Sequence, residues 1–234
     1  FEIVPLHGLP IVGLVFVVLS HAVSARFQEL VASQPRWLEL VEAIGVTDVT
    51  AYWMHRAAHA SPLLWRFHRV HHSSEQLDWL ASARVHPVDV VIMRSAQFGP
   101  LFLLGFSQET FGAYAALLTL WAVLLHGNVR FRFGPLRYLF ATPQFHHWHH
   151  ANDVGARDRN FAGLLPALDA LFGTLHVPPA QWPSTYGVDD RVPAGWLAQL
   201  ASPFRVVEER APSADAAAGD EARVDVVAPG LERA

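Results

Sequence analysis

Residues 55–72 read HRAAHASPLLWRFHRVHH, and a second histidine-rich stretch, HHWHH, follows at residues 146–150. Together the two stretches hold nine of the 14 histidines in the chain. The first contains the spacings H-x-x-x-H and H-x-x-H-H, and the second repeats H-x-x-H-H. On a helix, residues three and four apart lie on one face. Each motif can therefore direct two or three imidazoles at a metal ion, and H-x-x-H-H predicts a three-nitrogen cap from one helical turn.

The three motifs supply eight imidazoles. These belong to His55, His59, His68, His71, His72, His146, His149 and His150. Eight ligands are too many for one ion and suit two ions with four or five ligands each. Imidazole binds iron, zinc, copper and nickel, so the ligand type alone leaves the metal open. Zinc sites usually hold four protein ligands, or three with a water, so the larger number favours a pair of iron ions.

A solvated histidine-rich surface, or a row of histidines at a membrane interface, is the structural alternative. One such motif can arise by chance in a chain with 14 histidines. Three motifs with matching spacing are much harder to explain in that way. Buried imidazoles without a ligand would also leave nitrogens unsatisfied, at about 1–3 kcal/mol each. We therefore expect these histidines to bind metal.

The composition indicates a membrane protein. Hydrophobic residues make up 52% of the chain and charged residues 16%, against about 25% charged in typical soluble domains. Apolar stretches cover residues 8–24, 88–106 and 109–127, and the last two would each be about 28 Å long as helices, close to the thickness of a hydrocarbon core. The absence of cysteine excludes disulfides, thiolate zinc sites and iron–sulfur clusters, and the net charge of −4 argues against nucleic-acid binding.

Residues 88–127 are expected to form a two-helix hairpin that returns the chain to the side of the membrane it left. Arginines precede and follow this hairpin, which places both its ends on the cytoplasmic side. The two histidine-rich stretches flank the hairpin and would share that side. His86, just before the hairpin, and His126, at its far end, would join the metal site as two further ligands.

Other polar residues are candidates for orienting the ligands, because a ligating histidine usually donates its second N–H to a carboxylate or carbonyl. They are Asp48, Asp78, Asp158 and Asn160. Asp48 would lie about 10.5 Å along a helix from His55, so it would have to orient a histidine of another segment. By contrast, we expect His147 to pack against the site or to orient a ligand, and we expect no role in the site for His7, His21 and His176. As walls of a lipid pocket we consider Trp53, Trp65, Trp79 and Phe145.

The motifs and their order resemble the fatty acid hydroxylase/sterol desaturase superfamily over residues 45–176. The matching segments are Asp48–His59, His68–Ser74, Arg84–Pro87, His126–Val129, Thr142–His150, Asp158–Phe161 and Leu168–Thr174. The resemblance implies an all-α integral membrane helical bundle, with a cytosolic helical cap holding a histidine-rich dimetal centre. This domain would span residues 1–204. Residues 205–234, rich in Ala, Asp, Glu and Arg, would form a disordered tail.

The resemblance also implies a membrane-bound di-iron oxidoreductase. Such an enzyme would use dioxygen to hydroxylate or desaturate a C–H bond of a lipid, for example a sterol or a fatty acyl chain. The chain has no haem, flavin or iron–sulfur motif, so its electrons would come from a separate electron-transfer protein. We expect it in a bacterial inner membrane, with the histidine motifs on the cytoplasmic side.

Two other functions remain open at this point. A dizinc lipid hydrolase would use the same ligand type, and zinc can also replace iron in a purified protein. A membrane metal transporter or metal-binding protein without catalytic activity would place its ligands inside its spans. Here the motifs lie among arginines outside the apolar stretches, which favours an enzyme.

Overall fold

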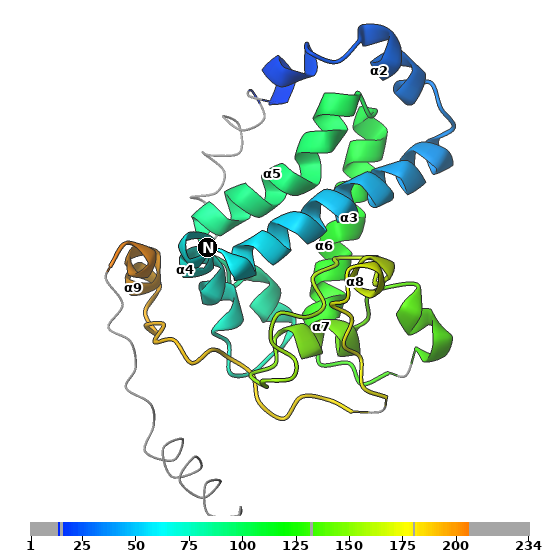
Figure 1. Cartoon of the computed structure of the whole chain (residues 1–234). Coiled ribbons are helices and arrows are strands. Elements are labelled where there is room, and N and C mark those ends of the chain that lie inside the picture. The colour runs from blue at the N-terminus through cyan, green and yellow to red at the C-terminus, as the bar shows by residue number, and fades with distance from the viewer. Residues whose placement is uncertain (1–13, 15, 132, 180, 206–234) are drawn as a thin grey trace, which may run out of the picture.

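The computed structural model describes residues 14, 16–131, 133–179 and 181–205. Within this part the secondary structure is helical, with no strand and a single isolated bridge between Ala151 and Tyr186 (Figure 1). The all-α prediction is confirmed for these residues. Residues 8–13 and 15 of the apolar stretch 8–24, and all but the first residue of the predicted tail, lie outside the described residues.

The helices labelled in Figure 1 are α2 (Ala25–Ala32), α3 (Arg36–Ala60), α4 (Pro62–His72), α5 (Pro87–Leu104), α6 (Gln108–His126), α7 (Pro143–His149), α8 (Ala167–Leu171) and α9 (Trp196–Ala201). Three short 3-10 helices lie between or after them, η1 (Trp79–Ala83), η2 (Gly134–Tyr138) and η3 (Ser202–Phe204). The connections between the labelled helices range from one residue, between α3 and α4, to 24 residues, between α8 and α9.

Polar caps followed by proline set where the histidine-bearing helices begin. Ser61 accepts a hydrogen bond from the backbone of α4, and Thr142 accepts one from the backbone of α7. Proline follows directly in both helices. In the first turn a backbone N–H has no acceptor within the helix, so the N–H that proline lacks is not needed, and the fixed φ of proline suits this position. These starts fix the helical register, and with it the face that each histidine occupies.

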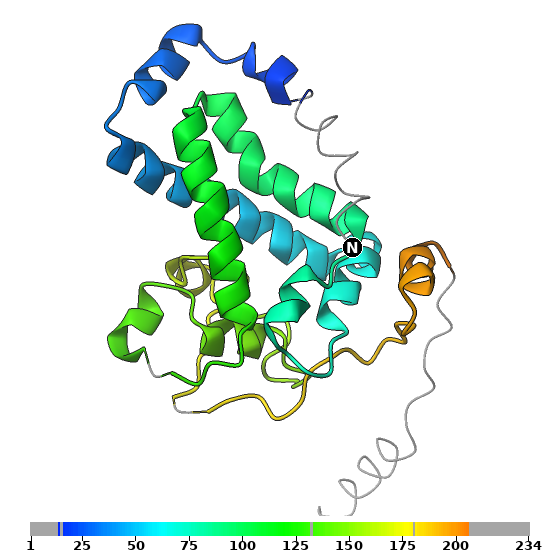
Figure 2. The same cartoon turned by 180° about the vertical axis from the view of Figure 1, so that it is seen from behind.

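Helices α5 and α6 form the predicted hairpin. The turn between them contains Gly105 at a φ of +81°, and a Cβ there would lie 2.4 Å from the Cβ of Gln28, so only glycine fits. Near this turn the two helices touch through Phe98 and Phe111, whose ring centroids are 4.9 Å apart. Farther from the turn the helices diverge, with α3 packed along one side (Figures 1 and 2).

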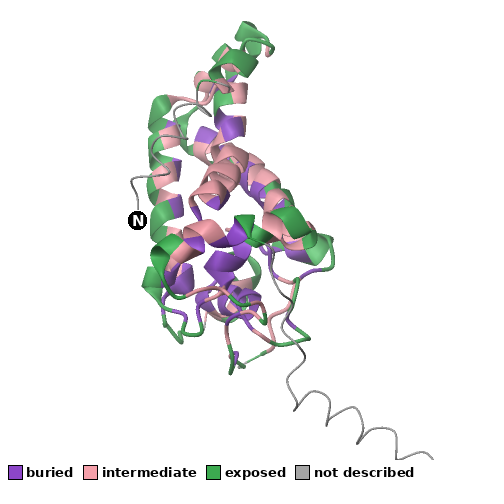
Figure 3. Ribbon diagram, turned by 90° about the vertical axis from the view of Figure 1, so that its left-hand side faces the viewer, coloured by how far each residue is buried: buried purple, intermediate pink, exposed green. Residues whose placement is uncertain are grey.

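Helices α5 and α6 are long and apolar enough to cross a membrane, judged by length and composition. Only 17% of α5 and 28% of an 18-residue window of α6 are buried inside the protein. The most buried residues gather instead at the end of the molecule away from the turn between α5 and α6, in the lower half of Figure 3. That end holds α4 and α7 (Figure 1), which carry three histidines each.

Candidate metal centre

Nine histidines from four helices form two groups at this end of the molecule. The first group consists of His55, His59, His68, His72 and His149, and the second of His71, His126, His146 and His150. Within each group the candidate ligand nitrogens lie within 4.8 Å of one another. The structure therefore brings together segments that are up to about a hundred residues apart in the sequence.

Each H-x-x-H-H motif is divided between the two groups. In α4, His68 and His72 belong to the first group and His71 to the second. In the second motif the division is reversed, because His146 and the C-cap residue His150 join the second group while His149 joins the first. The predicted three-nitrogen cap on one ion is therefore wrong. Side chains at i and i+4 are about 40° apart around a helix and those at i+3 and i+4 about 100°, so the outer pair shares one target and the inner residue faces another.

Backbone carbonyls fix the tautomer of several of these histidines. The Nδ1 atoms of His55 and His149 donate to the carbonyls of Phe161 and Arg159, both at 2.8 Å. In the second group, the Nδ1 atoms of His71 and His126 donate to backbone carbonyls at 3.2 and 2.8 Å. A carbonyl only accepts, so each Nδ1 carries the proton and each Nε2 keeps a lone pair for a metal.

Carboxylates fix the tautomer of two further histidines, both in the first group. Asp158, one of the residues expected to orient a ligand, lies 3.3 Å from the Nδ1 of His59. Asp89 has both carboxylate oxygens 3.1–3.2 Å from the Nδ1 of His68, a contact that the sequence reasoning missed. The available signal was an acid at the start of a membrane-length, largely apolar stretch, since such an acid needs a partner when it is buried.

Several Nε2 atoms approach one another more closely than neutral rings favour. In the second group, the Nε2 of His126 lies 3.2 Å from that of His71 and 3.0 Å from that of His146. His71 and His126 both use Nδ1 as the donor, so their Nε2 atoms present two lone pairs to each other. Ligands about 2.1 Å from one ion lie about 3.0–3.4 Å apart, so these separations suit a bound cation.

Buried ring nitrogens without a hydrogen-bond partner also favour a bound cation. The Nε2 atoms of His55, His59 and His149, and the Nδ1 of His150, are buried without a hydrogen-bond partner. Each would cost about 1–3 kcal/mol if left unsatisfied. The donor set therefore fits metal ions that prefer nitrogen ligands, with five imidazoles at one position and four at the other.

Burial also keeps these rings in the form that binds metal. Desolvation, with a further contribution from neighbouring imidazoles, holds the pKa values of the histidines in α4 and around α7 well below the usual range. This applies to His71, His72, His146, His149 and His150. They are neutral at physiological pH, and only a neutral imidazole coordinates a metal.

His86 is the one expected ligand that lies outside both groups. Its Nδ1 accepts from the backbone N–H of Val88 at 3.1 Å, which caps α5, and its Nε2 donates to the carbonyl of Leu200 at 3.2 Å. Both ring nitrogens are thus used, so the structure gives His86 a capping role in place of the ligand role we expected. His147 packs as expected, bonded to Tyr186 and to a backbone carbonyl.

The remaining orienting candidates act on the backbone and not on imidazoles. Asp48 accepts from the N–H groups of residues 163–165 at 2.7–3.0 Å, which ties that loop to α3. Asn160, in a left-handed conformation, donates to the carbonyls of Phe145 and His176. Asp78 caps η1. These three residues therefore shape the loops near the centre without contacting a ligand ring.

Asp169, a buried acid in α8, was not among the expected site residues. Its carboxylate accepts from the N–H groups of Phe161 and Ala162 at 2.7 and 2.9 Å, and from the Thr174 hydroxyl at 2.6 Å. Burial raises the pKa of Asp169. By holding Phe161 in place, this carboxylate positions the carbonyl that binds His55.

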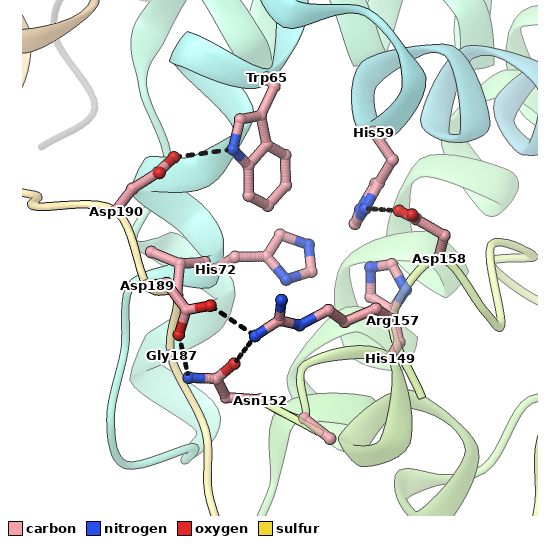
Figure 4. Close-up of a pocket in the computed structure, with 12 residues that line it drawn as sticks. His59, Trp65, His72, His149, Asn152, Arg157, Asp158, Gly187, Asp189 and Asp190 are labelled. Carbon is pink, nitrogen blue, oxygen red and sulfur yellow. Dashed lines mark hydrogen bonds and ion pairs between the residues drawn. The ribbon is translucent and has the colours of Figure 1, made fainter. Parts of the chain in front are cut away.

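A polar pocket of about 270 Å³ opens onto the first group (Figure 4). His59, His72 and His149 line it beside Trp65, whose indole N–H donates to Asp190 at 2.9 Å. Arg157 bridges Asn152 and Asp189 at its edge. Of the four aromatic residues expected to form walls, Trp65 lines this pocket, Trp53 and Trp79 are exposed, and Phe145 is buried in the core.

A second cavity, of about 170 Å³, lies between α5 and α6 and reaches both histidine groups. Its lining includes His55 and His68 of the first group and His71, His126 and His146 of the second. The metal centre therefore has a polar opening on one side and a cavity between the two apolar helices on another.

The fold and the site define a class of protein: a helical chain with two membrane-length apolar helices and two adjacent histidine groups that could each hold a metal ion. The chain belongs to the fatty acid hydroxylase family, whose sequence model matches residues 40–174. The resemblance drawn from the histidine motifs is confirmed by this match.

Curated relatives support the same membership. The chain is 35% identical to ornithine lipid hydroxylase OlsE of Rhizobium tropici over 73% of its length, 31% identical to alkylglycerol monooxygenase of Homo sapiens over 59%, and 29% identical to methylsterol monooxygenase 1-1 of Arabidopsis thaliana over 58%. The matches cover 51%, 31% and 46% of those proteins, so the chain spans about half their length or less. No solved structure matches the chain.

Proposed function

We propose that the chain is the catalytic region of a membrane-bound lipid hydroxylase that uses dioxygen and two iron ions. The observation that carries this proposal is the two-part histidine site, with five imidazoles in one group and four in the other. The names of the relatives support lipid oxidation, because each is a hydroxylase or monooxygenase named for a lipid.

The number of ligands supports iron over zinc. Zinc usually takes four ligands, and the first group offers five. Iron accommodates five nitrogens and still leaves a position for a small molecule. The proposed ligands are the nine grouped histidines, without His86. When bound, the iron pair supplies the reduction of dioxygen that drives oxidation of an unactivated C–H bond.

The residues of this chain supply the orientation and the dry surroundings. Carbonyls and carboxylates fix the proton on Nδ1 of His55, His59, His68 and His149, so that each Nε2 faces inward. The loop holding Phe161 is itself fixed by Asp169. Such hydrogen-bond partners commonly account for 10–100-fold in metal affinity or activity.

The overall reaction requires more than this chain. Hydroxylation combines one C–H bond, dioxygen, two electrons and two protons to give an alcohol and water. The electrons would come from a separate electron-transfer protein, since the chain carries no motif for an electron-carrying cofactor. Desaturation needs the same oxidant and electron supply, and the product then distinguishes the two outcomes.

Two helices of suitable length and composition support a location in a membrane. The histidine groups lie at the end of the hairpin where α5 begins and α6 ends. Arg84 precedes the hairpin and Arg130 follows it, so the positive-inside rule favours the cytoplasmic side of the membrane for this end. The membrane we propose is a bacterial inner membrane. The lipid would then enter between the helices.

The test begins with metal analysis of the protein purified from iron-supplied cells in detergent. We expect two bound iron ions per chain and oxidation of a lipid extract when a reductase system and isotopically labelled dioxygen are supplied. Label in the lipid product supports oxygenation. Label-free hydrolysis products, with zinc as the bound metal, would instead establish the dizinc hydrolase.

A further inference from the structure

Arg94 and Gln97 are polar side chains within the largely apolar sequence of α5. Arg94 lies about 10.5 Å along the helix from Pro87, and its Nη1 donates to the Gln97 side-chain oxygen at 2.7 Å. In the described part of the chain, Arg94 takes part in no ion pair. Ionisable residues in membrane-length helices are rare, and they usually face a functional cavity.

Both side chains line the 170 Å³ cavity that reaches the two histidine groups. Asp89 is the acid in the same lining, but both its carboxylate oxygens already face the Nδ1 of His68. The other wall of the cavity is largely apolar and includes Leu118 and Leu125 of α6. The Arg94 guanidinium is therefore a cation in a mostly apolar space, with donors available for a ligand.

We propose that Arg94, oriented by Gln97, binds an anionic oxygen group of the lipid substrate, a carboxylate or a phosphate. This inference rests on the proposed function, because it places that group beside the metal centre. A guanidinium is the side chain best suited to it, since its planar fork donates two parallel hydrogen bonds to such groups. Gln97 holds the fork by accepting from one of its nitrogens.

The size of the cavity also indicates where the oxidised carbon lies relative to the anionic group. Pockets that enclose a whole drug-sized ligand are about 300–1,000 Å³, and this cavity is about 170 Å³. It holds only the part of a lipid near the metal centre, while the rest of the lipid lies between the helices. The oxidised C–H bond would then lie near the anionic group, because Arg94 and the histidines line the same cavity.

Equilibrium binding of three probes tests the proposal: radiolabelled hexadecane, hexadecanoate and hexadecyl phosphate, each added to the iron-loaded full chain in detergent. We compare the unaltered chain with Arg94→Ala, so that partitioning into micelles cancels. Arg94→Ala should weaken binding of at least one anionic probe by about 10- to 100-fold and leave hexadecane unchanged. The anion that loses more affinity identifies the group.

Two further variants separate recognition from misfolding. Arg66→Ala removes an exposed arginine of α4 that lines neither cavity, and should bind all three probes like the unaltered chain. Gln97→Leu should give a smaller loss for the same anion, since it removes only the group that orients the guanidinium. Each variant is checked for an unchanged iron content and elution volume.

The outcomes distinguish this inference from the proposed function. If Arg94→Ala, with its iron content intact, leaves the preference between anionic probes and hexadecane unchanged, the inference is overturned even where lipid hydroxylation is observed. If the preference depends on Arg94 but no lipid is oxidised, the binding site stands and the proposed function fails.

Discussion

The division of H-x-x-H-H between two ions gives an unusual prediction for adjacent residues. His71 and His72 are neighbours in α4, yet His71 lies in the second group and His72 in the first. The variants His71→Ala and His72→Ala should therefore each weaken a different metal ion. If the motif instead capped one ion, both substitutions would weaken the same one.

The expected size of each effect follows from the groups. His71→Ala leaves the second group with three imidazoles, and His72→Ala leaves the first with four. Loss of a hydrogen-bond partner of a ligand already costs about 10–100-fold in affinity, so loss of the ligand itself should exceed about 100-fold at its own group. The other group, whose ligand nitrogens are unchanged, should lose less than about tenfold. His71→Ala should be the more damaging, because its group starts with fewer ligands.

The assay is retention of iron by the full chain during equilibration with chelators of increasing strength. Each single variant should release one ion early and hold the other, and the double variant His71→Ala/His72→Ala should release both. The reasoning is refuted if the double variant retains one tightly held ion. It is also refuted if the ion lost from the two single variants shows the same spectroscopic signature.

Three other predictions come from the neighbours of the ligands. His86→Ala should keep both metal ions, because His86 caps α5, whereas His126→Ala should lose the ion of the second group; metal analysis of the purified variants decides. Asp89→Asn should weaken the first-group ion by about 10–100-fold, since the carboxylate that fixes the His68 tautomer is gone; equal chelator resistance in variant and unaltered chain would contradict this. Asp48→Ala leaves three backbone N–H groups without their acceptor and should lower the free energy of unfolding by about 3 kcal/mol or more. Denaturant titration in detergent measures this free energy. A loss below about 1 kcal/mol would be too small for a carboxylate that holds residues 163–165 against α3.

The hairpin and the ligand helices could be predicted because their signals are local. Apolar stretches 88–106 and 109–127 match α5 and α6 closely, with ends set by Pro87 and by Gly105 at positive φ. Histidine spacing of three and four residues marked the correct helices. These features depend on the covalent neighbours of each residue, so the sequence contains them directly.

The contacts that complete the site depend on long-range packing and could not be predicted in the same way. His86 has the spacing of a ligand at the start of α5, but the segment at Leu200 packs against it and takes its second nitrogen. Asp158 and Asp78 were equally plausible partners for a ligand, yet only Asp158 faces one. Which acid meets which histidine is decided by loops that join distant parts of the chain, and helical periodicity carries no information about them.

The motifs nevertheless explain why the two groups differ in size. A helix with H-x-x-x-H, such as the end of α3, presents both imidazoles to one ion and serves the first group only. A helix with H-x-x-H-H serves both ions, with its outer pair on one and its inner residue on the other. The reversed arrangement of α4 and α7 makes these contributions equal, so the pair from α3 and the single His126 from α6 set the totals at five and four. Because α4 and the segment of α7 each supply histidines to both groups, neither group can shift without the other, which would hold two bound ions at a fixed separation.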